Sequence, residues 1–231
     1  MINPIFERLA LLTGNTGLEK LAAKNVLVFG AGGVGSWAAE ALVRCGIGKI
    51  GIIDNDIICS SNINRQLEAT VLTVGLPKAE TLKKRLLEIN PDCKITAWNE
   101  LYCSETSKKF GIENADYVID AIDTINHKLD LIETTVGSGV TIYSSMGMAQ
   151  KIDPSNIKVS SIWKTHGCPL ARAVRLGLRK RNFKEDFTVV YSGENIKRME
   201  NSRVNGSAVT VTACAGFMLA GLVLRGTLGV L

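Results

Sequence analysis

The stretch NVLVFGAGGVG at residues 25–35 places its glycines between a predicted strand and a predicted helix. Residues 25–30 form a short apolar, β-branched run that ends in glycine, which is typical of a buried parallel strand. Apolar residues at helical spacing follow over residues 34–45, and the run KIGIID at residues 49–54 predicts a second strand. The glycines therefore lie inside a β–α–β unit, which is the context that gives the pattern G-x-G-x-x-G its meaning.

Gly30, Gly32 and Gly35 match this pattern. The first glycine permits a tight turn, the second lets a phosphate approach the backbone, and the third allows close packing of helix on strand. The free N–H groups at the start of the following helix attract the phosphate. Asp54 ends the second predicted strand, where a carboxylate binds a ribose diol. The pattern predicts a nucleotide site and leaves the choice of nucleotide open.

Strands and helices continue to alternate over the first 150 residues. Further strands are predicted at residues 94–98, 116–123 and 140–145, with helices at 78–90 and 126–136. This alternation predicts an α/β fold, Rossmann-like, in which helices cover both faces of a doubly wound, mostly parallel sheet.

The 231 residues are expected to form one domain, 1–231, with three parts. Residues 1–150 are the predicted nucleotide-binding core, residues 151–206 a basic segment followed by a mobile polar loop from residue 191, and residues 207–231 an apolar C-terminal helix. No charged residue occurs between Arg203 and Arg225. We interpret this helix as a core or interface element, and a membrane span is the alternative.

Composition limits the classes of protein that fit. Apolar residues make up 46% and charged residues 21% of the chain, which predicts a folded core. The net charge of +5 mildly favours an anionic partner such as a nucleotide or RNA. The six cysteines are scattered without a C-x-x-C pair, so no zinc site is expected. With no cleavable signal peptide in the sequence, a cytoplasmic protein with reduced thiols is expected.

The segment after Asp54 decides between redox and phosphate chemistry. Asp56 follows it, SSNINRQ at residues 60–66 carries Arg65, and Lys78 begins a predicted helix. Asp120 and Asp123 lie at the end of the strand predicted over residues 116–123. The ends of parallel strands lie at one edge of a sheet, so cations and carboxylates meet at the phosphate-binding turn. Hydride transfer does not need this set, whereas phosphoryl or nucleotidyl transfer does. The alternative is a set of surface ion pairs.

Four segments together resemble the ThiF/HesA/MoeB adenylating family, the nucleotide-binding core of ubiquitin-activating-type enzymes. They are GAGGVGSWAAEAL, IIDNDIICSSNINRQ, VGLPKAE and VIDAIDT, and the resemblance covers about residues 5–150. It implies ATP, Mg²⁺ and attack of a carboxylate on the α-phosphate. It also implies a homodimer in which Arg8 reaches the partner's ATP.

The resemblance assigns roles residue by residue. Catalytic roles fall on Arg65, Lys78, Asp123 and Arg8, and metal binding on Asp123 and Asp56. The nucleotide-binding set that it implies is Gly30, Gly32, Gly33, Gly35, Asp54, Asp56, Asn62, Arg65, Lys78, Asp123 and Thr124.

Within this family the chain is most similar to the branch that acts on threonylcarbamoyladenosine in tRNA. VGSWAAEALVRCGIGKI, NINRQLEAT, EINPDCKI and KIDPSNIKVSSIWKT carry this similarity. It implies that ATP activates the carboxylate of the modified adenosine, which then cyclises. A basic stretch fits an RNA partner through phosphate contacts. The expected tRNA-binding residues are Lys164, Arg172, Arg175, Arg179, Lys180 and Arg181, and a solvated helix face is the alternative.

The sequence is also compatible with other functions. The nearest one adenylates the C-terminal Gly-Gly of a ubiquitin-like sulfur carrier, and a sulfur-relay protein is a further possible partner. An NAD-dependent oxidoreductase would use the glycines alone, and a non-enzymatic scaffold would use none of the converging charges. Cys168 is a candidate reactive thiol with a structural role as the alternative.

Overall fold

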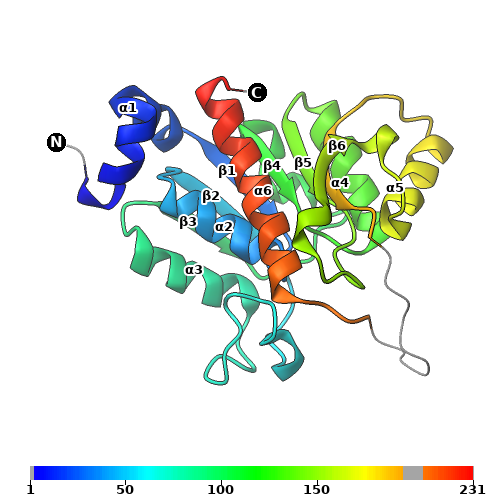
Figure 1. Ribbon diagram of the computed structural model, residues 1–231, viewed down its shortest axis with the longest axis horizontal. Coiled ribbons are helices and arrows are strands. Elements are labelled where there is room, and N and C mark those ends of the chain that lie inside the picture. The colour runs from blue at the N-terminus through cyan, green and yellow to red at the C-terminus, as the bar shows by residue number, and fades with distance from the viewer. Residues whose placement is uncertain (1–2, 195–204, 231) are drawn as a thin grey trace.

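A computed structural model describes residues 3–194 and 205–230 of the chain. Seven strands form one sheet in the order β3-β2-β1-β4-β5-β7-β6 (Figure 1), and the described pairs are parallel except for β6 with β7. The strands are β1 Asn25–Phe29, β2 Lys49–Ile53, β3 Lys94–Trp98, β4 Tyr117–Asp120, β5 Thr141–Ser145, β6 Ile157–Ser161 and β7 Thr188–Ser192. The doubly wound, mostly parallel sheet that the sequence predicts is confirmed.

Helices cover both faces of the sheet. The helices are α1 Glu7–Ala22, α2 Gly35–Arg44, α3 Lys78–Ile89, α4 Ile125–Gly137, α5 Pro169–Lys180 and α6 Val209–Leu228. Apolar residues of α2, α3 and α6 share one buried cluster with the sheet, and those of α4 and α5 share another. Short 3₁₀ turns occupy Pro4–Phe6, Ser60–Asn62, Ser107–Phe110, Ile112–Asn114, Pro154–Asn156 and Ile162–Lys164.

The order of the strands reverses at β1, which lies between β2 and β4. Phe29, the last residue of β1, pairs with Ile53 of β2 and with Asp120 of β4, so these three strands end in one row. Two further backbone hydrogen bonds hold these strand ends together: Gly30 N donates to Ile53 O at 2.8 Å, and Ala121 N donates to Phe29 O at 2.8 Å. The carboxyl ends of the strands therefore open into a crevice at the point where ligands bind in such sheets.

One boundary of the predicted polar loop is wrong. Tyr191 and Ser192, placed in that loop from the sequence, end strand β7, and both side chains are buried. The strand lies between β5 and β6 and is hydrogen-bonded to a neighbouring strand along each of its edges. The polar residues that follow dominate the local composition and hide this five-residue strand. Residues 195–204 of the predicted mobile loop lie outside the described residues.

Helix α6 is long and apolar enough to cross a membrane, and half of its most apolar window is buried within the protein. It packs against α2, where a β-carbon at Gly216 would lie 2.5 Å from the Val34 carbonyl oxygen. The rings of Trp37 and Phe217 meet edge to face at 5.8 Å. Figure 1 shows α6 lying across the sheet beside α2. This placement favours the core reading of the helix over a membrane span.

Helix α1 lies at one end of the molecule (Figure 1). Gly14 interrupts the helix with a positive φ of 67°, and the helix is kinked at this residue. Leu11 and Leu12 in the first half are 84% and 85% exposed. These two leucines give this end of the molecule an apolar surface.

Candidate active site

A cavity of about 920 Å³ opens at the carboxyl ends of β1, β2 and β4. All the predicted catalytic and nucleotide-binding residues contribute to its lining except Gly35, Asn62 and Arg8. Its predicted lining residues are Gly30, Gly32, Gly33, Asp54, Asp56, Arg65, Lys78, Asp123 and Thr124. Apolar walls come from Ile53, Leu101, Tyr102, Met146, Met148 and Leu170. The cavity therefore combines a charged end with an apolar end, as a nucleotide requires.

The glycine loop forms the floor of the charged end. Gly30 has a φ of 90°, and a β-carbon there would lie 2.8 Å from the Ala121 carbonyl oxygen. At Gly35 a β-carbon would fall 1.8 Å from the Gly30 carbonyl oxygen, so only glycine allows α2 to start this close to the strand. Gly32 and Gly33 both line the cavity. The loop thus presents backbone, without side chains, to a phosphate group.

Asp54 is tied to this loop. Its carboxylate accepts the Ala31 N–H at 2.7 Å and the Asp56 N–H at 2.8 Å. Burial raises the pKa of Asp54, and the nearby Lys78 charge and both N–H groups oppose that shift. These bonds hold the side chain at the end of β2, where it lines the cavity. A carboxylate fixed there suits the hydroxyls of a ribose.

Lys78 and Arg65 supply the positive charge. Lys78 begins α3, is 5% exposed, and places its ammonium 2.7 Å from the Asp56 carboxylate. The side chain of Asp56 is 62% exposed, so water solvates the carboxylate of this pair while the Lys78 side chain is buried. The Arg65 guanidinium donates to the Ser61 carbonyl at 2.8 Å and to the Asn64 side chain at 2.9 Å. A polyphosphate would meet two cations whose positions are already restricted.

Asp123 and Thr124 lie on the turn that joins β4 to α4. Both are exposed, both line the cavity, and within the described chain Asp123 makes no ion pair. No group of three or more metal-binding side chains occurs among the residues described. Mg²⁺ in nucleotide sites is held by one or two carboxylates together with phosphates and waters. Asp123 fits that role, whereas Asp56 is engaged by Lys78 and fits it less well.

A buried carboxylate that was not predicted from the sequence, Glu68, lies near Lys78 and Asp54. Glu68 is 2% exposed, and neither of its carboxylate oxygens has a hydrogen-bond partner in the described part of the chain. Burial raises the pKa of Glu68 to about 8, and the Lys78 charge only partly opposes this. A buried acid without partners is energetically costly when it is ionised. Burial of Glu68 therefore favours its neutral, protonated form.

Several residues that line the cavity were also missed from the sequence. Gln66 is 7% exposed and its side-chain oxygen lacks a partner among the described residues. Thr212 comes from the first turn of α6, 147 residues after Arg65. Ser207 also lines the cavity, and its backbone carbonyl accepts a hydrogen bond from the Asn64 side chain at 3.0 Å. The loop after β5 contributes Met146 and Met148. The adjacency of Gln66 to Arg65 was the only sequence signal that could have indicated any of them.

Three residues of the predicted catalytic and nucleotide-binding sets, Gly35, Asn62 and Arg8, are not in the cavity lining; Gly35 instead packs against the Gly30 carbonyl. The Asn62 side-chain oxygen accepts the Cys59 N–H at 3.0 Å and closes the turn before Arg65, so its direct phosphate contact stays a prediction. Arg8 lies on α1, whose later residues border a different cavity. Cys168 is 3% exposed at the start of α5, which fits the structural alternative for this thiol.

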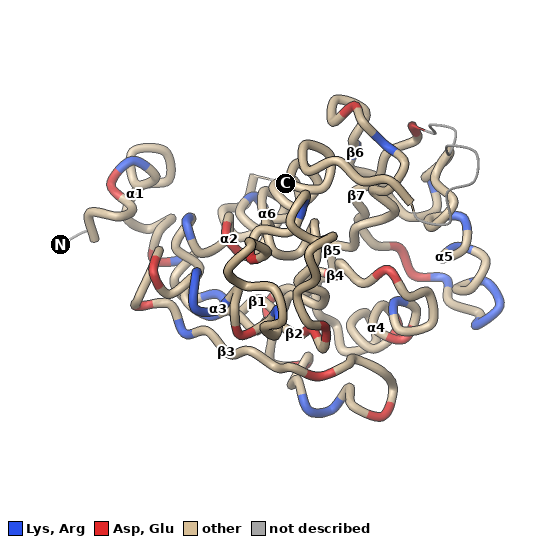
Figure 2. Tube along the Cα trace, turned by 90° about the horizontal axis from the view of Figure 1, so that it is seen from below, with Lys and Arg blue, Asp and Glu red and all other residues tan. Residues whose placement is uncertain are grey.

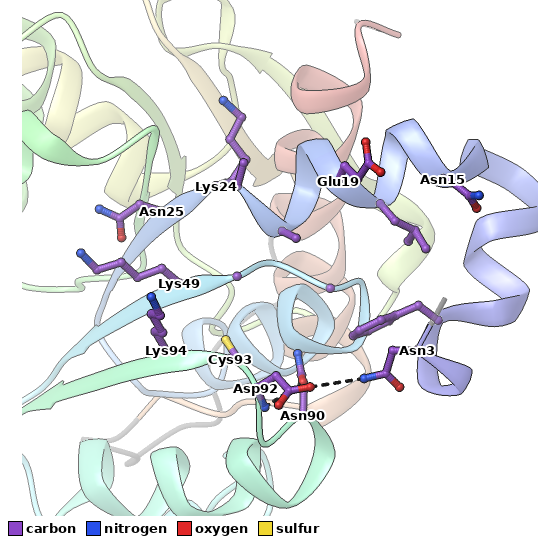
Figure 3. Close-up of a pocket in the computed structure, with 16 residues that line it drawn as sticks. Asn3, Asn15, Glu19, Lys24, Asn25, Lys49, Asn90, Asp92, Cys93 and Lys94 are labelled. Carbon is purple, nitrogen blue, oxygen red and sulfur yellow. Dashed lines mark hydrogen bonds between the residues drawn. The ribbon is translucent and has the colours of Figure 1, made fainter. Parts of the chain in front are cut away.

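The different cavity, of about 810 Å³, lies at the amino ends of β1, β2 and β3. Figure 3 shows its lysines, Lys24, Lys49 and Lys94, on one side and Asp92 bonded to Asn3 on the other. Lys24 is already paired with Asp116 at 2.8 Å. Ligands of doubly wound sheets bind at the carboxyl ends of the strands, so this cavity is not the candidate active site.

The predicted RNA-binding residues gather on and near α5. In Figure 2 the basic segments of α5 lie beside acidic segments of α4. Arg181 is bound to Asp130 and Glu133 at 2.6 and 2.7 Å, and the Arg179 guanidinium lies 5.6 Å from the centre of the Trp163 ring. Arg175 donates to the Thr165 hydroxyl, whereas Lys164, Arg172 and Lys180 are exposed and pair with no other side chain among the described residues. Leu170 of the same helix lines the cavity.

The chain belongs to the ThiF family, whose sequence model matches residues 6–229. A tRNA threonylcarbamoyladenosine dehydratase of Bacillus subtilis is 44% identical over 190 residues, 82% of this chain and 75% of the relative. The Escherichia coli protein of that name is 39% identical over 181 residues, 78% of this chain and 66% of the relative.

Solved structures agree with these relatives. The Escherichia coli dehydratase in complex with ATP matches with a TM-score of 0.91 and 35% identity, over 97% of this chain and 93% of that one. Its complex with AMP matches with a TM-score of 0.92 and 34% identity, over 99% and 97%. The comparisons favour the tRNA-modifying branch over the sulfur-carrier and oxidoreductase alternatives.

Proposed function

We propose that the chain is an ATP-dependent dehydratase that adenylates the carboxylate of threonylcarbamoyladenosine in tRNA and promotes its cyclisation. The observation that carries this proposal is the convergence of Asp54, Arg65, Lys78 and Asp123 on one cavity floored by a glycine loop. The names of the relatives supply the substrate class, and the ATP and AMP complexes of the Escherichia coli structure supply the nucleotide.

The reaction divides into two displacements. A carboxylate oxygen of the modified adenosine attacks the α-phosphorus of ATP, and the bond to the bridging oxygen breaks as pyrophosphate leaves. A nitrogen of the same modified base then attacks the activated carbonyl, loses its proton, and releases AMP. Both nucleophiles belong to the substrate, so no enzyme thiol is required. The buried position of Cys168 is compatible with this scheme.

The side chains act on charge and position. Arg65 and Lys78 stabilise the negative charge that grows on the phosphates during the first displacement. Asp54 orients the ribose, and the glycine loop fixes the phosphates through backbone N–H groups. Asp123 would hold Mg²⁺, which neutralises phosphate charge when it is bound.

The direct test measures AMP and pyrophosphate formed by the purified protein from ATP. Three samples contain threonylcarbamoyl-modified tRNA, unmodified tRNA, or no RNA, and a fourth contains the modified tRNA with the Arg65→Ala variant. The proposal expects AMP only from the wild-type protein with the modified tRNA. Silence with every RNA would contradict it, and AMP formed instead with a carrier protein ending in Gly-Gly would favour the sulfur-carrier alternative.

We also propose that the chain works as a homodimer in the cytoplasm, with Arg8 completing the partner's site. Arg8 lies on α1 beside the exposed Leu11 and Leu12, and α1 is absent from the lining of its own nucleotide cavity. An isologous dimer lets one helix serve the other site in both directions. A sulfur-relay protein as a further partner has no support from the described residues.

Mixing two inactive variants tests the shared site. Arg8→Ala subunits keep Lys78, and Lys78→Met subunits keep Arg8. If Arg8 acts across the dimer, random mixing restores about a quarter of wild-type AMP formation, because half of the dimers are mixed and each has one complete site. If Arg8 acts within its own chain, the mixture stays as inactive as either variant alone.

For the tRNA surface, Arg172→Ala is expected to weaken binding of the modified tRNA and to reduce the slope of log Kd against log salt by about 1. Arg172 is exposed on α5, three residues from Arg175 on the same helix face. Arg181→Ala is the matched control, since that guanidinium is engaged by Asp130 and Glu133. Equal salt slopes for both variants and wild type would place the RNA elsewhere.

A further inference from the structure

A charged pair without any exposed surface lies beneath the turn that carries Asp123. Asp120 ends β4, Lys128 lies in the first turn of α4, and both side chains are 0% exposed. Their charged atoms are 2.8 Å apart. Neither side chain lines the nucleotide cavity, so the proposed reaction does not use them directly.

The pair is bonded to both ends of the turn. The Lys128 ammonium donates to the Ile122 carbonyl at 2.8 Å, and the Lys128 N–H donates to the Thr124 carbonyl at 3.0 Å. The Asp120 carboxylate accepts the Ile122 N–H at 3.1 Å and the Ser144 hydroxyl of β5 at 2.6 Å. Residues 121–124 are therefore held between two strands and a helix, while Asp123 projects on the exposed side.

Stability alone does not account for this arrangement. Taking two charges out of water costs several kcal/mol for each ion, and apolar residues of similar volume are often as stable or more stable. Buried polar networks that are fully bonded instead fix one geometry. A fixed geometry has an evident use here, because Ala121, Ile122, Asp123 and Thr124 all line the cavity.

We propose that Asp120 and Lys128 are positioning residues that hold the turn at residues 121–124, and with it Asp123, at the phosphate end of the cavity. The effect passes through the Ile122 backbone, which bonds to both side chains. This inference rests on adenylation taking place in the same cavity. The pair does not touch the nucleotide in this scheme and sets only the placement of groups that do.

The test separates stability from rate by comparing three variants. Lys128→Met leaves the Asp120 charge buried without its partner, so both stability and rate should fall. Lys128→Met/Asp120→Leu removes both charges, so stability should recover. Its turnover with modified tRNA should stay lowered about 100-fold, because the turn has lost its anchors. Lys128→Arg keeps the positive charge and should retain most of the wild-type turnover.

Lys24→Met is the matched control. Lys24 pairs with Asp116, which lies just before β4, at the opposite end of that strand from Asp120. This variant should leave turnover unchanged. If the rate of the double variant recovers together with its stability, the pair is merely structural and the proposal is overturned. The ATP affinity of the double variant should change less than its turnover.

Amide hydrogen exchange gives a readout that needs no activity. The amides of Ala121 and residue 128 are bonded to the Phe29 and Thr124 carbonyls and report on the two ends of the turn. In the double variant both should lose protection while the rest of the sheet keeps it. Unchanged protection would overturn the positioning role. An inactive wild-type protein with normal exchange results would instead count against the proposed function alone.

Discussion

Replacing Lys78 by methionine is expected to lower the rate of AMP formation about 100- to 1,000-fold while the protein stays folded. Lys78 is the first residue of α3 and the only cationic residue of that helix that lines the cavity. Its loss removes charge stabilisation that is needed most when the phosphates carry the most charge. The measurement is kcat for AMP release, together with the melting temperature.

The folded state should tolerate this change for a specific reason. Methionine keeps the buried apolar stem of Lys78, and the carboxylate that loses its partner belongs to Asp56, whose side chain is 62% exposed. Water can therefore solvate the orphaned charge, and ion pairs with an exposed member contribute about 0–1 kcal/mol. Lys84→Met on the exposed side of α3 is the control and should change neither quantity.

Two outcomes would contradict this account of Lys78. A wild-type rate would show that Arg65 alone stabilises the phosphates. A rate loss matched by a large drop in melting temperature would assign Lys78 to folding. The same variant should also raise the pKa of Asp54, since the Lys78 charge lowers it in the wild-type protein.

Much of this fold could be predicted from sequence because the relevant signals are local. The run 25–35 contains a strand, a glycine turn and the start of a helix, and each has its own composition. The charged residues after β2 and β4 could be placed together because all parallel strands end at one edge. Strand β7 escaped detection because its five residues adjoin a polar stretch that outweighs them.

The rest of the site depends on contacts between distant segments. Thr212 reaches the cavity only because α6 folds back over the glycine loop, and no local pattern announces that contact. Lys128 and Glu68 are charged residues in polar-looking segments, yet both are buried. Exposure of a charged side chain is the usual expectation, so sequence alone gives no reason to exclude them from the surface.

Glu68 is the case with a large energetic consequence, and Glu68→Gln is expected to stabilise the protein by about 3 kcal/mol at pH 7. The pKa of this acid is about 8 in the folded protein against an ordinary 4.5. Between those values the folded state keeps a proton that the unfolded state releases. Stability contributed by that site is thus fully present below pH 4.5 and is lost as the pH rises toward 8.

Glutamine has nearly the same shape and cannot ionise, so it removes this pH dependence. The gain should be close to zero near pH 4.5, should grow through pH 7, and should level off at about 5 kcal/mol above pH 8. Urea unfolding at several pH values measures it, with the exposed Glu88→Gln as the control. A gain that did not vary with pH would show that packing, rather than the buried proton, causes the effect.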